Sequence, residues 1–386
     1  MTTDFDDFCL WVYVIVDDIF QQIEFLFRRP GPKPVYSDSE LIAMSIIGAC
    51  RGWDQETEFL ANFQEHRDLF PNIPSQSRYN RRRRNLMMAF NLIRQIILKK
   101  MDIALDDSAV IDSLPVPVVQ FYLVPGSTGD WQAYGATFGK VPSKKETIFG
   151  YKLHLLITLS GLILDFELAP ANETDLNVGY ELLCQHTDLR VFGDKAYISQ
   201  EKAEELWRNQ RIRLQTLPRK NQKKAIPVEM RKLFNRIRQR IETVNNQLSN
   251  QFNIETNHAH TFWGLCTRLY TKLAAHTISI YINRLLGNDD FLQIKALAFS
   301  KALLVSSQSA AGVDAAAEKP GLAGDPAGLV QPVLSQTARK STEPVDRAGA
   351  TDAFVGQSDG RFERAFRSLW DARGRGSLVM STWPRA

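Results

Sequence analysis

The chain has 386 residues, and 44% of them are hydrophobic, which is enough for two or three domains with substantial cores. Its formal net charge of +4 argues against a uniformly basic protein, and its four scattered cysteines argue against a disulfide framework or a zinc site. The longest apolar run near the start, residues 8–16, is too short to span a bilayer and lies between two acidic residues. These features predict a cytoplasmic protein without a membrane segment.

Residues 1–105 are predicted to be helical. Ser37, with Glu40 three residues later, forms a capping-box pattern in front of an apolar run. A second apolar repeat with helical spacing runs from Leu86 to Ile97. Five arginines crowd the front of this second helix: Arg78, Arg81, Arg82, Arg83 and Arg84. They are explained either by a solvated helix face or by a DNA-contacting helix, and we favour the second interpretation.

Short β-rich runs alternate with helical patterns in residues 106–298. Two apolar runs joined at Ser160 and Gly161 predict a hairpin. A helix, a strand ending at Asp194, another helix, a short strand and a long helix over residues 230–252 follow. This order predicts an α/β (α+β) fold, in which helices flank a mixed sheet. Residues 299–386 are rich in Ala, Gly, Ser and Pro without a sustained period, and we predict that they are disordered.

Three carboxylates occupy unusual places in this pattern. Asp112 interrupts a β-rich run, Asp194 ends an apolar strand, and Glu242 lies on the long helix four residues after Arg238. Singly, each acid is most simply a turn, a cap or a surface ion pair. If they converge, their charges require a cation, and oxygen ligands favour Mg²⁺ or Mn²⁺. Two such ions support phosphodiester chemistry.

A strongly basic stretch lies between the second and third of these carboxylates. Residues 207–240 contain twelve Lys or Arg but only one acid, Glu229. Such a stretch favours contact with nucleic-acid phosphates over a merely solvated loop. The candidates within it are Arg219, Lys220, Lys223 and Lys224.

Several segments together resemble a known protein family. The segments VIDSLPV, GYKLHLLITLSGLILDFELAPANETD, VFGDKAY and RQRIETVNNQLSNQF look like the core of prokaryotic insertion-sequence transposases of the DDE, ribonuclease H-like class. Asp112 and Asp194 fall on the family's two aspartates, and Glu242 falls on the Glu of its R-x-x-x-E helix. Asn235 and Ser249 depart from the Tyr and Lys that many relatives in neighbouring branches have. The residues after about 300 have no recognised counterpart.

The resemblance implies a ribonuclease H-like catalytic core over residues 106–298, after a helical DNA-binding region over residues 1–105. It implies binding of terminal inverted repeats, metal-dependent strand cleavage and joining of the freed 3′-hydroxyl to target DNA. Two Mg²⁺ or Mn²⁺ ions would be held by Asp112, Asp194 and Glu242, with Lys195 and Arg238 contacting phosphate or orienting carboxylates. Gly193 would leave room for backbone and substrate.

The implied partners are DNA and further copies of the chain, with at least a dimer when two ends are synapsed. The alternatives are a metal-dependent nuclease that does not join DNA and a catalytically inactive DNA-binding relic.

Overall fold

The N-terminal region is helical, as the sequence predicts. The computed structural model describes residues 5–28, 31–32, 34–101, 107–141, 144–216, 228–256, 258–288, 292–294, 297 and 378–379. The helices of the N-terminal region are α1 (Phe5–Ile23), α2 (Asp38–Arg51), α3 (Glu56–Gln64), α4 (Gln76–Asn85) and α5 (Met87–Lys100), with a short 3-10 helix over Glu24–Phe27.

The sequence predicted the start of α2 correctly but missed the boundary between α4 and α5. The capping box is confirmed, because the Ser37 hydroxyl accepts from the Glu40 amide and the Glu40 carboxylate accepts from the Ser37 amide. The single helix expected to carry both the arginines and the Leu86–Ile97 repeat is instead two helices. Leu86 has ψ near 7° and ends α4, and α5 begins at the next residue. The arginines therefore lie on a separate helix, α4.

A mixed sheet follows the helical region. Its strands are β1 (Ser108–Val119), β2 (Thr137–Val141), β3 (Glu146–Thr158), β4 (Ile163–Pro170), β5 (Arg190–Gly193), β6 (Arg213–Thr216) and β7 (Leu378–Val379). The order is β6-β5-β1-β3-β4-β7, with β2 paired to β3. Strands β1, β3 and β4 are antiparallel neighbours, whereas β5 and β6 run parallel to β1. This mixed sheet with flanking helices confirms the predicted α/β class and fits a ribonuclease H-like fold.

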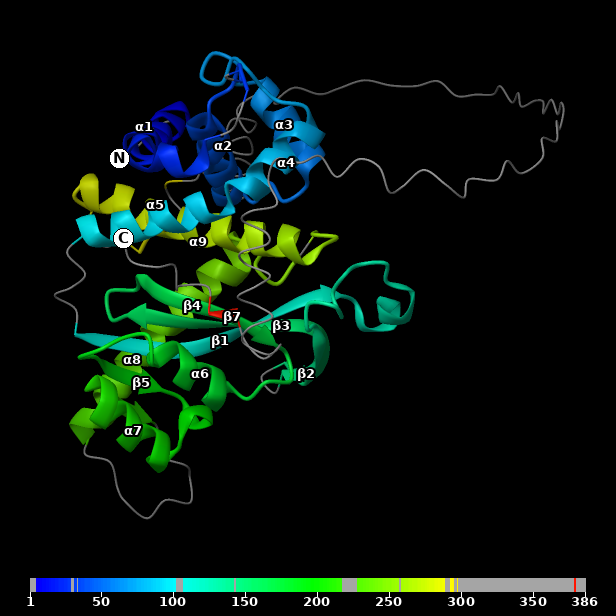
Figure 1. The fold of residues 1–386 in the computed structure, drawn as a ribbon. Helices are drawn as coiled ribbons and strands as arrows, with labels where there is room; N and C mark the ends of the chain where they lie inside the picture. Colours follow the sequence, from blue (N-terminus) through cyan, green and yellow to red (C-terminus); the bar gives the residue numbers. More distant parts are fainter. Residues whose placement is uncertain are drawn as a thin grey trace, which may run out of the picture.

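Helices cover both faces of the sheet (Figure 1). The remaining helices are α6 (Asp175–Leu183), α7 (Gln200–Gln210), α8 (Val228–Asn246) and α9 (Phe262–Leu285), with one-turn helices at Phe121–Gly126, Lys195–Tyr197 and Gln247–Gln251. The face that includes Ala109 and Ile111 packs with residues of α6 and α7. The opposite face packs against α8, where the rings of Phe192 and Phe234 are 5.6 Å apart. Side chains that alternate along β1 therefore meet different helices.

Helix α9 packs against α2 and α5 of the N-terminal region (Figure 1). It follows the sheet in the chain, yet its buried residues join the same core as those of α1, α2 and α5. Arg94 of α5 is buried and donates a hydrogen bond to the carbonyl of Ile163 on β4 at 2.5 Å. This bond connects the N-terminal helices directly to the sheet. Consequently the helical region and the sheet share contacts through both α5 and α9.

Two sequence predictions fall largely on residues outside the described part. The segment 299–386 is described only at Leu378–Val379, which pairs with β4. The basic candidates Arg219, Lys220, Lys223 and Lys224 lie outside the described residues altogether. Among the helices that the structure does describe, none is long and apolar enough to cross a membrane.

Candidate active site

Two of the three predicted carboxylates are neighbours in the sheet. Ile111 of β1 is the register partner of Gly193 of β5, so Asp112 and Asp194 follow side by side on parallel strands. Because successive side chains on a strand alternate between faces, both aspartates share the α8 face with Val110 and Phe192. The sheet register thus places the first two carboxylates together.

Asp194 begins a short 3-10 helix over Lys195–Tyr197. Its Oδ1 accepts from the Ala196 amide at 2.7 Å, which fixes the carboxylate at the end of β5. The neighbouring Lys195 is exposed. A Cβ added to Gly193 would lie 3.2 Å from Tyr197 Cβ and Cδ2. Tyr197 therefore packs closely against Gly193, and the expected role of Gly193 in leaving room for substrate stays a prediction.

Asp112 is oriented by helix α8. Asn245 Nδ2 donates to Asp112 Oδ2 at 2.8 Å, while Asn245 Oδ1 is buried without a partner in the described part of the chain. Burial raises the pKa of Asp112 to about 6, and the charges of Asp194 and Asp175 add to the rise. The bonds from Ser113 and Asn245 act in the opposite direction. A nearby cation would stabilise the ionised form of a buried carboxylate whose pKa is raised in this way.

Glu242 lies one turn before Asn245 on α8 but is held by another residue. Arg238 Nε donates to Glu242 Oε1 at 2.8 Å, and the two side chains are 69% and 55% exposed. Within the residues described, no group of three or more His, Cys, Asp or Glu side chains is arranged to hold a metal ion. The structure therefore brings Asp112 and Asp194 together and leaves Glu242 paired with Arg238 on the exposed surface of α8.

Other residues at this site received no functional role from the sequence. Asp175, at the start of α6, accepts from Lys152 Nζ at 2.7 Å and its charge reaches Asp112. Burial raises the pKa of Tyr197 well above its usual range, and Asp175 and Asp112 add to the rise. The Tyr197 hydroxyl is buried without a partner in the described structure. Asp175 and Tyr197 lie in the LAPANETD and GDKAY segments, which resemble the transposase family. Their spacing in the sequence did not predict that the two residues lie close together in the fold.

The five arginines of α4 do not share one environment. Arg78, Arg81 and Arg84 are exposed. Arg82 is 4% exposed, and its guanidinium pairs with Asp38 and donates to the carbonyl of Phe27. The prediction that Arg82 contacts DNA is corrected accordingly, because these two partners already engage its guanidinium within the fold.

Arg83 is also mostly buried. Its side chain is 11% exposed, and its Nη1 lies 4.0 Å from Glu56 Oε1. The candidates for contact along the outer face of α4 are therefore Arg78, Arg81 and Arg84, spaced three residues apart on one side of the helix.

Comparison with known proteins gives one positive result. Residues 109–261 match a family model described as a transposase DDE domain. No curated protein and no solved structure matches the chain. The matched segment begins in β1, contains Asp112, Asp194 and Glu242, and ends at the start of α9. This match supports a DDE-class transposase domain over residues 109–261.

Proposed function

We propose that the chain is an insertion-sequence transposase that binds the terminal inverted repeats of its element, cleaves DNA strands and joins the freed 3′-hydroxyl to a target. The observation that carries the proposal is the side-by-side placement of Asp112 and Asp194 inside the matched transposase DDE domain. Synapsis of two DNA ends would require at least two copies of the chain.

The residues at this site fit divalent metal ions. The side-chain donors are carboxylate oxygens, which Mg²⁺ and Mn²⁺ prefer. The raised pKa of Asp112 and the buried, unpartnered oxygen of Asn245 both favour an added cation. Asp112 and Asp194 would bind two ions, and Glu242 would complete one site after releasing Arg238. When bound, the ions would activate water or a 3′-hydroxyl and stabilise the leaving oxygen.

The chain's own residues would orient the site and bind the substrate. Asn245 holds the Asp112 carboxylate at a fixed angle, and the Ala196 amide does the same for Asp194. Arg238, once released from Glu242, and the exposed Lys195 would contact the scissile strand's phosphates. Arg78, Arg81 and Arg84 on α4, together with the basic segment Arg219–Lys224, would bind DNA outside the reacting bond.

Substitution of the two neighbouring aspartates tests the assignment. Asp112→Asn and Asp194→Asn should abolish cleavage of a labelled duplex that carries the element's ends, while DNA affinity stays within about twofold. Mn²⁺ binding, followed by electron paramagnetic resonance without DNA, should weaken in both variants. Asp188→Asn, which changes an exposed carboxylate in the loop before β5, is the matched control. Cleavage by either active-site variant at the parent's rate would remove that residue from the site.

A further inference from the structure

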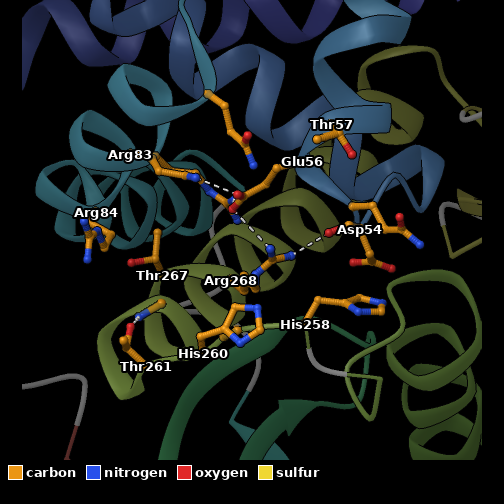
Figure 2. A pocket seen from close by; sticks show the side chains of 15 residues that line it. Asp54, Glu56, Thr57, Arg83, Arg84, His258, His260, Thr261, Thr267 and Arg268 are labelled. Atoms are coloured by element: carbon orange, nitrogen blue, oxygen red, sulfur yellow. Dashed lines mark hydrogen bonds and ion pairs between the residues drawn. The ribbon is translucent and has the colours of Figure 1, made fainter. Parts of the chain in front are cut away.

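A polar pocket lies between the N-terminal helices and the start of α9, away from the two aspartates. Its volume is about 620 Å³, and it is lined by the residues just before and within α3, by α4, and by residues 258–268 (Figure 2). Basic and hydroxyl side chains face it from both sides, including Arg84, His258, His260 and Thr261. The pocket thus brings together segments that are at least 174 residues apart in the sequence (258 − 84).

The charged network at and beneath the floor of this pocket contains more buried cations than carboxylates, and one of its members, Lys272, lies outside the pocket lining. Arg268 donates to the carbonyl of Asp54 at 2.8 Å and to Glu56 at 3.2 Å, and Lys272 lies 2.8 Å from Asp54. Arg83 is the third cation, at 4.0 Å from Glu56 (Figure 2). The exposed fractions of the three cationic side chains are 11%, 12% and 7% for Arg83, Arg268 and Lys272. Three positive charges against two negative charges leave one positive charge uncompensated in this network.

The two carboxylates of the network already accept other hydrogen bonds, so they do little to compensate the surplus positive charge. Glu56 also accepts from Asn80 at 2.6 Å, and Asp54 also accepts from Asn253 at 2.7 Å. Arg83 is the poorly satisfied member, because its Nε is buried without a partner in the described structure. Burial lowers the pKa of Arg268, and the nearby charge of Arg83 lowers it further. A buried cation without a full partner is costly, so an anion entering the pocket would be stabilised.

Arg84 extends the positive charge to the mouth of the pocket. It is exposed, and its side chain forms no ion pair or hydrogen bond with any residue that the structure describes. Arg78 and Arg81 continue along α4 from this point. If one phosphate of a DNA strand were held on the pocket floor, the next phosphates of the same strand could contact this row of exposed arginines.

We propose that this pocket binds a phosphate group of DNA, with Arg83 and Arg84 as its principal donors. The inference rests on the proposed function, in which DNA is the substrate. A phosphate bound here contacts α4 and the first turns of α9 at once, so it would couple the N-terminal region to the helix that follows the sheet.

The test compares Arg83→Met with the parent, using inorganic phosphate and a labelled random-sequence duplex as probes. Phosphate at ten times its Kd should raise the Tm of the parent by about 2 °C over chloride at equal ionic strength, and DNA should compete with it. In Arg83→Met this rise should disappear, while the Tm without ligand equals or exceeds that of the parent, because the surplus charge is gone. Duplex affinity should fall roughly tenfold and its salt slope by about 0.9.

The control is Lys99→Met, which removes an exposed cation from the last turn of α5 and should keep the phosphate-induced rise in Tm. Duplex binding with an unchanged salt slope in Arg83→Met would overturn the inference and leave the proposed function intact. A lower Tm in Arg83→Met with the phosphate effect retained would assign Arg83 to folding alone and overturn it too. Stabilisation by phosphate that DNA does not compete with would refute the assignment to DNA. Failure of the parent to cleave its element's ends would count against the proposed function and not against this site.

Discussion

Two adjacent arginines of α4 should respond differently to substitution by alanine: Arg82→Ala should lower the stability of the fold, and Arg81→Ala should weaken the salt dependence of DNA binding. Arg82 is 4% exposed, donates to Asp38 through Nε at 2.7 Å and through Nη2, and donates to the Phe27 carbonyl at 2.9 Å. Removing one partner of a buried pair leaves the other charge poorly compensated and costs about 3 to 5 kcal/mol. Asp38 is 16% exposed, which favours the lower end of that range. Arg82→Ala should therefore lower the free energy of unfolding by about 3 kcal/mol.

Urea unfolding and fluorescence anisotropy with a labelled duplex measure the two effects separately. Arg81→Ala should change the free energy of unfolding by no more than about 0.5 kcal/mol and should reduce the salt slope of DNA binding by about 0.9. Folded Arg82→Ala should keep the parent's salt slope. The double variant Asp38→Ala/Arg82→Ala should be destabilised by less than the sum of the two single changes. A loss of less than about 1 kcal/mol in Arg82→Ala, or a reduced salt slope in the folded variant, would refute the structural role of Arg82.

Three further predictions concern stability and organisation. Burial lowers the pKa of His276 to about 3 and that of His154 to about 4, so the unfolded chain binds protons below pH 6.5 that the folded chain excludes. Stability should fall as the pH drops from about 6.5 toward 4, by about 2 kcal/mol per histidine at pH 5, and His276→Gln should flatten the urea-unfolding profile over that window. A variant whose profile matches the parent's would contradict this assignment. Gly179→Val should lower Tm, since even a Cβ at this position would lie 2.4 Å from the Tyr197 ring, and an unchanged Tm would mean that the ring moves freely. Limited proteolysis should cut beyond about residue 299 before it cuts the core, and early cleavage within residues 106–298 would contradict the predicted boundary.

The sequence predicted the fold class and most elements because their signals are local. The Ser37–Glu40 capping box, the turn at Gly161 and the strand that ends before Asp194 each depend on a few adjacent residues. Strand β2 was missed, because its five residues, TFGKV, have a weak pattern and are stabilised by pairing with β3. The break at Leu86 was missed for a similar reason, since the apolar repeat continues across it.

The site was predicted less completely, because its geometry depends on contacts between distant segments. Adjacent apolar strands could suggest that Asp112 and Asp194 meet, whereas the Asn245 bond to Asp112 spans 133 residues. The burial of Arg82 had a partial signal, because Tyr79, Arg82 and Leu86 share one helical face. In a run of four consecutive arginines, the sequence could not show which arginine faces the core. The packing of α2 against α4 decides it.

In the proposed function, this chain cleaves and joins DNA with Asp112, Asp194 and Glu242. The most direct test is nicking and joining of a labelled duplex with the element's own ends, in Mg²⁺, Mn²⁺, Ca²⁺ or EDTA, for the parent and Glu242→Gln. We expect joined product from the parent in Mg²⁺ or Mn²⁺, none in EDTA, and none from Glu242→Gln, which should still bind the duplex. Cleavage without joining by the parent would indicate a nuclease instead. Joined product from Glu242→Gln at the parent's level would contradict the three-carboxylate site.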